Sequence, residues 1–208
     1  MLYLMPRVSE QYLADRRAQI LLAARRCFGR NGFHQTSMQD LFAEAGMSAG
    51  AIYRYFRSKD EMVVAIAEET FGEVIDTMLS VARRDRAAPL GEALAAAVEL
   101  IASKDETDGL CALAVQVWSE AQRKPELAAS FGALVRKARA EVTRMVRLRQ
   151  DAGMLPDGAT ASSIASVVTA ILPGYIMQRA LLGPGAVRGV PDGLRALWPN
   201  VPATARRS

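Results

Sequence analysis

Hydrophobic residues recur at intervals of three and four along nearly the whole chain, which is the spacing of amphipathic helices. Runs of β-branched residues that favour strands are scarce. Helix-stop and helix-start residues divide the pattern, beginning with Asn31-Gly32 and continuing with breaks at 85–89, 105–106, 124–125 and 153–156. The sequence therefore predicts an all-α protein with helices at about 9–30, 37–45, 48–56, 58–84, 90–103, 107–123, 126–152, 157–182 and 192–198.

Two of the expected helices are short and are joined by a tight turn that contains glycine. Ser37 is the expected N-cap of the first, Gly46 ends it, and Ser48 caps the second. This pairing is typical of a helix-turn-helix, which would complete an N-terminal bundle of three helices. The segment Ser58-Lys59-Asp60-Glu61 then reads as a capping box that opens a long helix. We expect a helix-turn-helix domain over residues 1–58 and a larger helical domain over residues 59–208.

The second of the two short helices has an unusual outer face. On a helical wheel Ile52 and Phe56 fall together on the side that packs inward. Gly50, Tyr53, Arg54 and Arg57 fall on the opposite side, where an ordinary surface helix has no reason to display glycine and tyrosine. A helix that enters the major groove of DNA has such a reason, because Arg54 would reach guanine and Gly50 would let the backbone approach a phosphate. The expected DNA contacts are Thr36, Ser37, Gln39, Ser48, Ala49, Gly50, Tyr53, Arg54, Tyr55 and Lys59. Among these, Thr36, Ser37 and Lys59 are assigned to the phosphate backbone.

The charge distribution supports a polyanion-binding end. Residues 1–60 contain nine Lys and Arg against five Asp and Glu, whereas the rest of the chain contains seventeen of each sign. The whole net charge of +4 therefore lies in the part that contains the helix-turn-helix pattern.

Enzymatic and metal chemistry find little support in the sequence. Cys27 and Cys111 are the only cysteines and both lie in apolar helical patterns, so we expect two buried thiols rather than a disulfide. His34, the only histidine, lies in a loop without a nucleophile signature nearby. We predict no enzyme activity, no cofactor and no metal. The uncharged stretch 158–178 is too polar and too broken by Pro173-Gly174 for a membrane span, which favours a cytoplasmic protein.

The residues from Thr36 to Met62, and especially Tyr53, Phe56 and Lys59 at their spacing, resemble the N-terminal signature of TetR-family transcriptional regulators. The resemblance covers about Arg16 to Val64, and the family pattern usually has an isoleucine–alanine pair where Leu41-Phe42-Ala43 stands here. It implies a homodimer, usually a repressor, that leaves a palindromic or near-palindromic DNA operator when a small molecule binds the C-terminal domain. Two alternatives remain open: an activator, and a small-molecule-binding module without regulatory DNA binding.

The C-terminal stripes suggest a pocket for a small, largely apolar effector and a dimer interface. Aromatic residues with polar tips suit such a pocket, whose expected lining is Phe71, Met78, Trp118, Phe131, Ile171 and Tyr175. The uncharged segment 158–178 is more apolar than one packed face requires, so we expect it to pair with its twin across a two-fold axis. The expected interface residues are Val168, Leu172, Ile176, Arg179, Leu194 and Trp198. Which side of this helix lines the pocket and which the interface stays open.

Overall fold

The computed structural model describes residues 10–85 and 88–199, and every regular element in these residues is helical. The chain divides into two compact units, one up to Ile66 and one from Ala67 onward. The expected boundary lay at residue 58, whereas this division falls inside the long helix α4 (Lys59–Arg84). The shift has a physical reason, since Met62, Val63 and Ile66 in the first two turns of α4 are buried.

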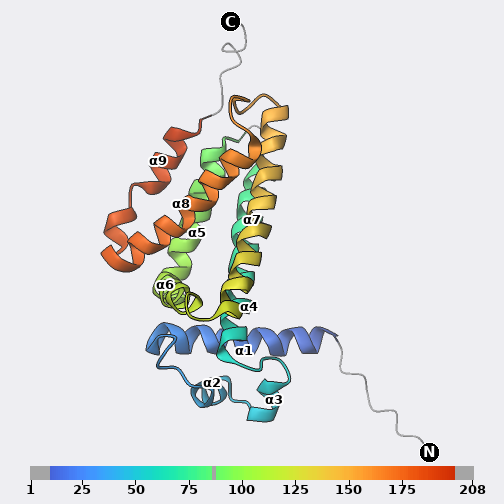
Figure 1. Cartoon of the computed structure of the whole chain (residues 1–208), viewed down its shortest axis with the longest axis vertical. Coiled ribbons are helices and arrows are strands. Elements are labelled where there is room, and N and C mark those ends of the chain that lie inside the picture. Colours follow the sequence, from blue (N-terminus) through green and yellow to red (C-terminus); the bar gives the residue numbers. More distant parts are fainter. Residues whose placement is uncertain (1–9, 86–87, 200–208) are drawn as a thin grey trace, which may run out of the picture. The chain divides into compact units, whose positions relative to one another are not determined.

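The N-terminal unit is built from α1 (Glu10–Asn31), α2 (Met38–Ala45), α3 (Ala49–Tyr53) and the start of α4 (Figure 1). Each helix turns apolar side chains inward, and the fully buried ones include Ile20, Phe28, Leu41, Ile52 and Met62, together with Phe33 of the loop between α1 and α2. α2 packs against α1, and α3 packs against α2. The expected helix-turn-helix is therefore confirmed as a local structure.

Local capping chemistry sets the ends of these short helices. The Ser37 hydroxyl accepts from the Asp40 N–H, and the Asp40 carboxylate accepts from the Ser37 N–H, which completes a capping box at α2. Gly46 ends α2 in the left-handed conformation at φ 62°. At the start of α4 the Ser58 hydroxyl accepts from the Glu61 N–H as expected, but the Glu61 carboxylate reaches one residue further back, to the N–H of Arg57.

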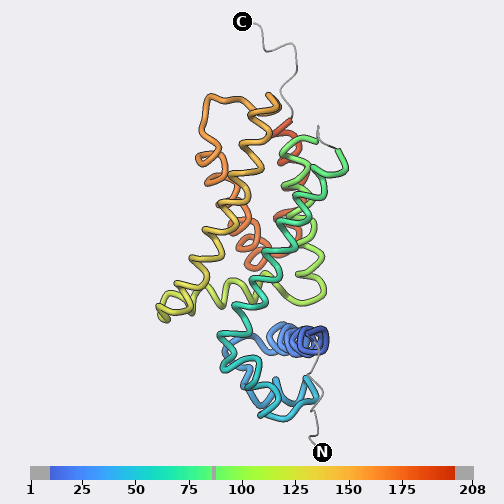
Figure 2. The backbone as a smooth tube through the Cα atoms, turned by 90° about the vertical axis from the view of Figure 1, so that its right-hand side faces the viewer, coloured from blue at the N-terminus to red at the C-terminus, as the bar shows by residue number. Residues whose placement is uncertain are grey.

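The C-terminal unit, called the body below, contains five further α-helices in its described residues. They are α5 (Leu90–Asp108), α6 (Leu110–Ala121), α7 (Pro125–Asp151), α8 (Ala161–Leu182) and α9 (Val190–Leu197), with a 3-10 turn at Pro184–Val187. α8 packs along α7 and also contacts α6, while α9 packs on α5. Figure 2, turned from the view of Figure 1, shows the long helices of the body as extended parallel and antiparallel tubes.

The joint between α5 and α6 differs from the expectation. It was expected at Asp105-Glu106, but α5 continues to Asp108 and ends at Gly109, whose φ of 65° lies in the left-handed region. Asp105 lies inside α5. Its carboxylate accepts from the N–H of Cys111 at 2.8 Å, in the first turn of the next helix, where backbone N–H groups have no partner within their own helix. The carboxylate therefore caps the helix that follows instead of ending its own.

The core of the body is one cluster of buried apolar residues from all of its helices. It includes Val74 and Met78 of α4, Leu94 of α5, Val146 of α7 and Val168 of α8. By length and composition alone α8 could cross a membrane, a test that core helices of other proteins also pass. Here one side of α8 packs on α6 and α7, while 22% of its most apolar stretch is buried.

Candidate functional site

The surface of α3 meets the expectation for a helix that is free to touch a ligand outside the chain. Ile52 is fully buried and Phe56 nearly so, and they hold the helix to the unit. Gly50 and Arg54 are exposed, and 48% of Tyr53 is accessible. The helix proper has five residues and ends at Tyr53, with Arg54 as its C-cap. The outward face is therefore shorter than the wheel assumed, and Tyr55 lies half-buried in the turn that follows.

Packing beneath this face fixes the tyrosine but does not explain the glycine. The ring of Phe42 from α2 meets the Tyr53 ring edge-on, with centroids 5.5 Å apart, so one edge of the exposed tyrosine is anchored. A Cβ placed on Gly50 would meet no atom within 4 Å among the described residues, and its φ does not require glycine. The fold itself gives no reason for glycine at this position.

Three expected phosphate contacts have other partners in the structure. Thr36 is 1% exposed, and its hydroxyl donates to the Gly32 carbonyl at 2.7 Å. Ser37 uses both its N–H and its hydroxyl on the Asp40 carboxylate, which keeps the pKa of Asp40 below its usual value. The Lys59 ammonium donates to the carbonyls of Phe33, His34 and Thr36 at 2.8, 3.3 and 3.1 Å.

Lys59 therefore links two segments of the N-terminal unit through hydrogen bonds. An ammonium has three hydrogens, and three carbonyls of the loop between α1 and α2 accept them. The same ammonium lies 4.5 Å from the centroid of the Phe33 ring. The side chain joins the first residue of α4 to the loop that leads into the helix-turn-helix. The assignment of Thr36, Ser37 and Lys59 to the phosphate backbone stays a prediction, although their polar groups have partners within the chain.

The other expected DNA contacts, together with one further arginine, make up one candidate surface. Gln39, Ser48, Ala49, Gly50, Tyr53 and Arg54 are exposed, and Tyr55 is half-buried. Arg57, which was not among the expected contacts, is also exposed in the turn after α3. Its place on the outer side of the wheel was the available signal. We call these eight residues the α3 surface.

In the body the expected pocket residues divide into two groups. Met78, Ile171 and Tyr175 belong to or pack against the main apolar cluster. Phe71, Trp118 and Phe131 are half-buried and are not among the described members of that cluster. The structure thus places three of the six, from α4 and α8, in or against one apolar cluster.

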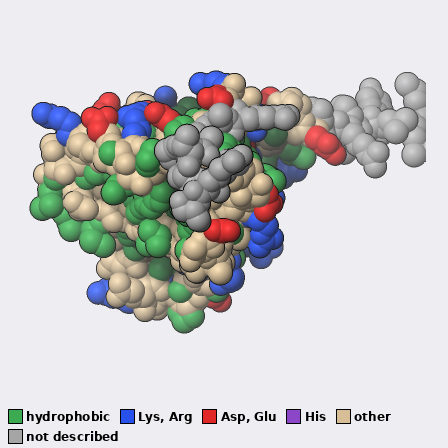
Figure 3. All heavy atoms as spheres, turned by 90° about the horizontal axis from the view of Figure 1, so that it is seen from above, with side chains coloured by type: hydrophobic (Ala, Val, Ile, Leu, Met, Phe, Trp, Pro, Cys, Tyr) green, Lys and Arg blue, Asp and Glu red, His purple; other side chains and the backbone are tan. Residues whose placement is uncertain are grey.

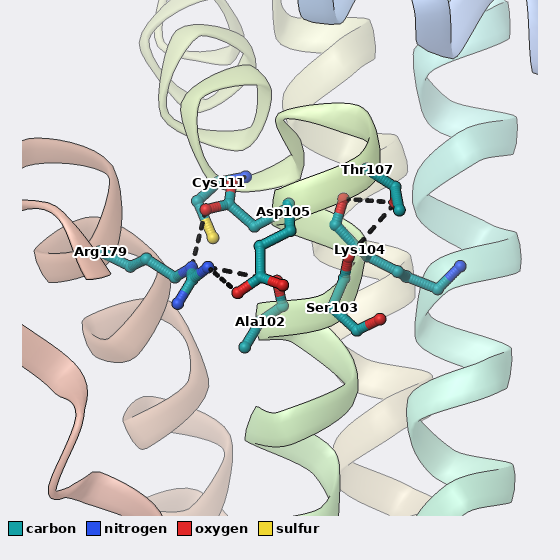
Figure 4. A network of polar contacts seen from close by, with 8 residues as sticks. Ala102, Ser103, Lys104, Asp105, Thr107, Cys111 and Arg179 are labelled. Carbon is teal, nitrogen blue, oxygen red and sulfur yellow. Dashed lines mark hydrogen bonds and ion pairs between the residues drawn. The ribbon is translucent and has the colours of Figure 1, made fainter. Parts of the chain in front are cut away.

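A buried ionic network near Tyr175 replaces one of the expected dimer contacts. Arg179 of α8 donates to the Asp105 carboxylate at 2.7 Å, to the Ala102 carbonyl at 3.2 Å and to Glu106 at 3.3 Å (Figure 4). Burial, followed by the nearby Asp105 charge, raises the pKa of the Cys111 thiol to about 12, so this cysteine stays a neutral thiol. Both cysteines are free and buried, as expected. Arg179 therefore ties α8 to the α5–α6 joint of its own chain.

Two more of the expected dimer residues are buried in their own chain, and a third contacts its own α5. Val168 is fully buried and Leu194 nearly so. Gly91 allows α9 to approach α5, because a Cβ there would lie 2.3 Å from the Leu194 carbonyl oxygen. The Gly91 N–H donates to the carbonyl of Trp198 at 3.2 Å. α9 is therefore part of the body's own packing.

The apolar surface that α8 leaves exposed lies on its other side. Val167, Met177 and Leu181 are 52%, 48% and 67% accessible, and Ala170 between them is exposed. Their spacing of three, seven and four residues places them on one helix face. Figure 3, which views the body from its end, shows hydrophobic side chains gathered on the side where Figure 1 places α8 and α9. We call Val167, Ala170, Met177 and Leu181 the α8 stripe.

A helix-turn-helix on a small basic unit, joined by a long helix to an all-helical body, defines a class of DNA-binding regulators. The family of bacterial regulatory proteins named tetR matches residues 20–66, and the C-terminal family of BetI-type transcriptional repressors matches residues 89–197. The chain belongs to the TetR family. The family is one of regulators and not of enzymes, in agreement with the prediction of no enzyme activity.

Individual relatives agree with this membership. The HTH-type transcriptional repressor Rv1474c of Mycobacterium tuberculosis is 28% identical over 176 residues, which are 85% of this chain and 88% of that protein. A regulator from Saccharomonospora viridis in complex with choline superposes with a TM-score of 0.66 at 22% identity, covering 88% of this chain and 95% of its own. FadR from Bacillus subtilis in complex with stearoyl-CoA gives a TM-score of 0.71 at 18% identity, covering 86% and 96%. The two structures show the same fold.

Proposed function

We propose that this protein is a homodimeric transcriptional repressor that binds a palindromic or near-palindromic operator through the α3 surface. The observation that carries the proposal is that Gly50, Tyr53 and the C-cap residue Arg54 are exposed together, whereas Ile52 of the same helix is fully buried. In this proposal Arg54 reads a guanine edge, and Tyr53 touches a phosphate or a thymine methyl group. Relatives that are named repressors support repression over activation. We expect the protein to act in the cytoplasm, where its DNA target lies.

The second half of the proposal is release from the operator when a small, largely apolar molecule binds the body. α4 supports this coupling, because it runs without interruption from Lys59 to Arg84 and contributes Met78 to the body's core. Its first residue, Lys59, donates hydrogen bonds to carbonyls of the loop before α2. A ligand that shifts α4 would therefore move the helix-turn-helix and change the separation of the two recognition helices. That separation must match about 34–36 Å, one turn of DNA, or a multiple of it.

A gel-shift experiment with DNA that flanks the protein's own gene tests the DNA-binding half. We expect specific binding that weakens steeply as salt is raised, because phosphate contacts release counterions. Arg54→Ala should relax base choice at one position of each half-site, at a cost of about 1–3 kcal/mol. Gly50→Ala should lower affinity for every sequence while leaving the folded protein at least as stable, since nothing within 4 Å opposes the added methyl group.

Binding that is non-specific or insensitive to salt would contradict the proposal and favour a ligand-binding module without regulatory DNA binding. Arg139→Ala serves as a matched control, because it removes an exposed arginine from α7, outside the proposed surface. It should leave the operator affinity unchanged. A transcription assay on the bound promoter separates a repressor from an activator.

A further inference from the structure

Among the residues that the structure describes, the buried charged side chain of Arg149 has no carboxylate partner. Arg149 stands in the last turn of α7 and is 4% exposed. It continues the buried stripe of that helix at the position where an apolar residue would be expected, one turn after Met145. That stripe consists of Leu134, Ala138, Val142 and Met145.

The guanidinium of Arg149 is almost unbonded among the residues that the structure describes. Its Nε has no hydrogen-bond partner, and its Nη1 donates only to the Met145 carbonyl at 3.5 Å, the outer limit for such a bond. Burial lowers the pKa of Arg149, and no carboxylate opposes that effect.

Arg179, another buried arginine of the body, does have carboxylate partners. Arg179 is buried to a similar degree in the same body, and it has carboxylates at 2.7 and 3.3 Å. The negative end of a helix stabilises a nearby cation only modestly, and the cost of burying an unpaired charge is several-fold larger. A buried arginine that lacks an internal counter-ion therefore points to a counter-ion from outside the chain.

The residues around Arg149 indicate what kind of molecule would contain that counter-ion. Met145 and Val146 precede Arg149 in α7, and Leu155, whose N–H donates to the Arg149 carbonyl, follows it. All three belong to the apolar cluster that also contains Met78 and Tyr175. The planar fork of a guanidinium binds a carboxylate or a phosphate through two hydrogen bonds. A ligand bound here would place an oxyanion on Arg149 and its remaining atoms among apolar side chains.

We propose that Arg149 is the anchor for an oxyanion, carboxylate or phosphate, on a small and otherwise apolar ligand. The proposal names the chemical class of the effector, and in that respect it rests on the proposed function. The binding itself does not depend on DNA. Because Arg149 is buried, the ligand enters by a local opening of the helices around the end of α7.

Matched eight-carbon probes on the full chain test the inference: octanoate, octyl phosphate and the neutral 1-octanol, with inorganic phosphate as a head group alone. At a hundredfold excess over its Kd, octanoate or octyl phosphate should raise Tm by about 5 °C or more, and octanol should not. Arg149→Met should abolish this shift while raising the Tm of the ligand-free protein, because it removes an unpaired buried charge. Arg147→Met, which changes an exposed arginine two residues away, should keep the wild-type shift.

Arg149→Lys keeps the charge but loses the fork, and it should weaken anion binding at least tenfold. Equal shifts with octanol and octanoate, an undiminished shift in Arg149→Met, or no shift with either anion would each overturn the inference. A loss of dimer mass in Arg149→Met would also overturn it, since it would assign the counter-ion to a second copy of the chain. Operator binding is measured on the same samples without probe: if it persists while the anions have no effect, the ligand class is wrong and the DNA-binding function stands.

Discussion

At the scale of single residues, the structure separates side chains that hold the fold from those that face outward. Tyr53 and Arg54 are exposed as the wheel indicated, and Ile52 is buried. Thr36 and Lys59 also lie near the helix-turn-helix, but their polar atoms are bonded to backbone carbonyls. Polar residues close to a binding motif are therefore not automatically part of its binding surface.

Lys59→Met makes this distinction measurable. The variant removes three hydrogen bonds to the loop between α1 and α2, so we expect the free energy of unfolding to fall by about 1–3 kcal/mol. Urea denaturation of the ligand-free protein measures the loss. If Lys59 instead contacted a phosphate, stability would be unchanged and the salt dependence of operator binding would fall by about one counterion. Lys137→Met, at an exposed position of α7, is the control for loss of a lysine.

At the scale of elements, caps and close approaches decide where helices end and what they pack on. Gly109 ends α5 and Thr160 caps α8, and both act through bonds to residues a few positions away. The attachment of α9 to α5 is different, because it joins distant parts of the chain. Arg195 of α9 bonds Glu92 at 3.1 Å and Glu99 at 2.8 Å, beside the close contact at Gly91.

Gly91→Ala tests that attachment. The added methyl group would lie 2.3 Å from the Leu194 carbonyl oxygen and 2.9 Å from the Arg195 Cα, both backbone atoms that cannot rotate away. We expect α9 to be displaced and the free energy of unfolding to fall by about 1–3 kcal/mol, against the small gain that Ala normally brings to a helix. Thermal unfolding measures the loss, and faster amide exchange at 190–197 locates it.

Gly72→Ala in α4 is the matched control, because a Cβ there meets no described atom within 4 Å. It should leave stability unchanged or slightly raised. Equal behaviour of the two variants would show that the contact between α9 and α5 does not constrain the body.

At the scale of the whole molecule, the open question is how two copies associate. Val168, Arg179 and Leu194 are used inside one chain, and we propose that the dimer instead uses the residues that α8 leaves exposed. The α8 stripe of Val167, Ala170, Met177 and Leu181 offers apolar side chains at helix-pairing intervals. Side chains so exposed and so apolar commonly mark a protein interface.

Val167→Arg should therefore convert the dimer to a monomer and weaken operator binding by at least tenfold, because each monomer would hold only one half-site. Size-exclusion chromatography with light scattering measures the mass. Thr143→Arg, on α7 and outside the stripe, should leave the mass unchanged. A Val167→Arg protein that stays dimeric would assign the interface to another face.

The sequence by itself determined the helical class, the order and approximate ends of the helices, and the exposed character of Gly50, Tyr53 and Arg54. These properties are set by periodicity and by caps that act over three or four residues, so the local sequence contains the necessary information. The helical spacing of the apolar residues in α7 also indicates that Arg149 is a charged residue at an apolar position.

Only the tertiary structure decided which partners the polar and charged side chains bond to. The bonds of Lys59 to Phe33 and of Arg179 to Asp105 join residues 26 and 74 positions apart, and no local pattern specifies such pairs. The same holds for the two faces of α8, since both are apolar and the packing of α6 and α7 determines which one is buried. Whether a buried charge has a counter-ion is likewise a property of the assembled fold, and for this reason the unpaired state of Arg149 became visible only in three dimensions.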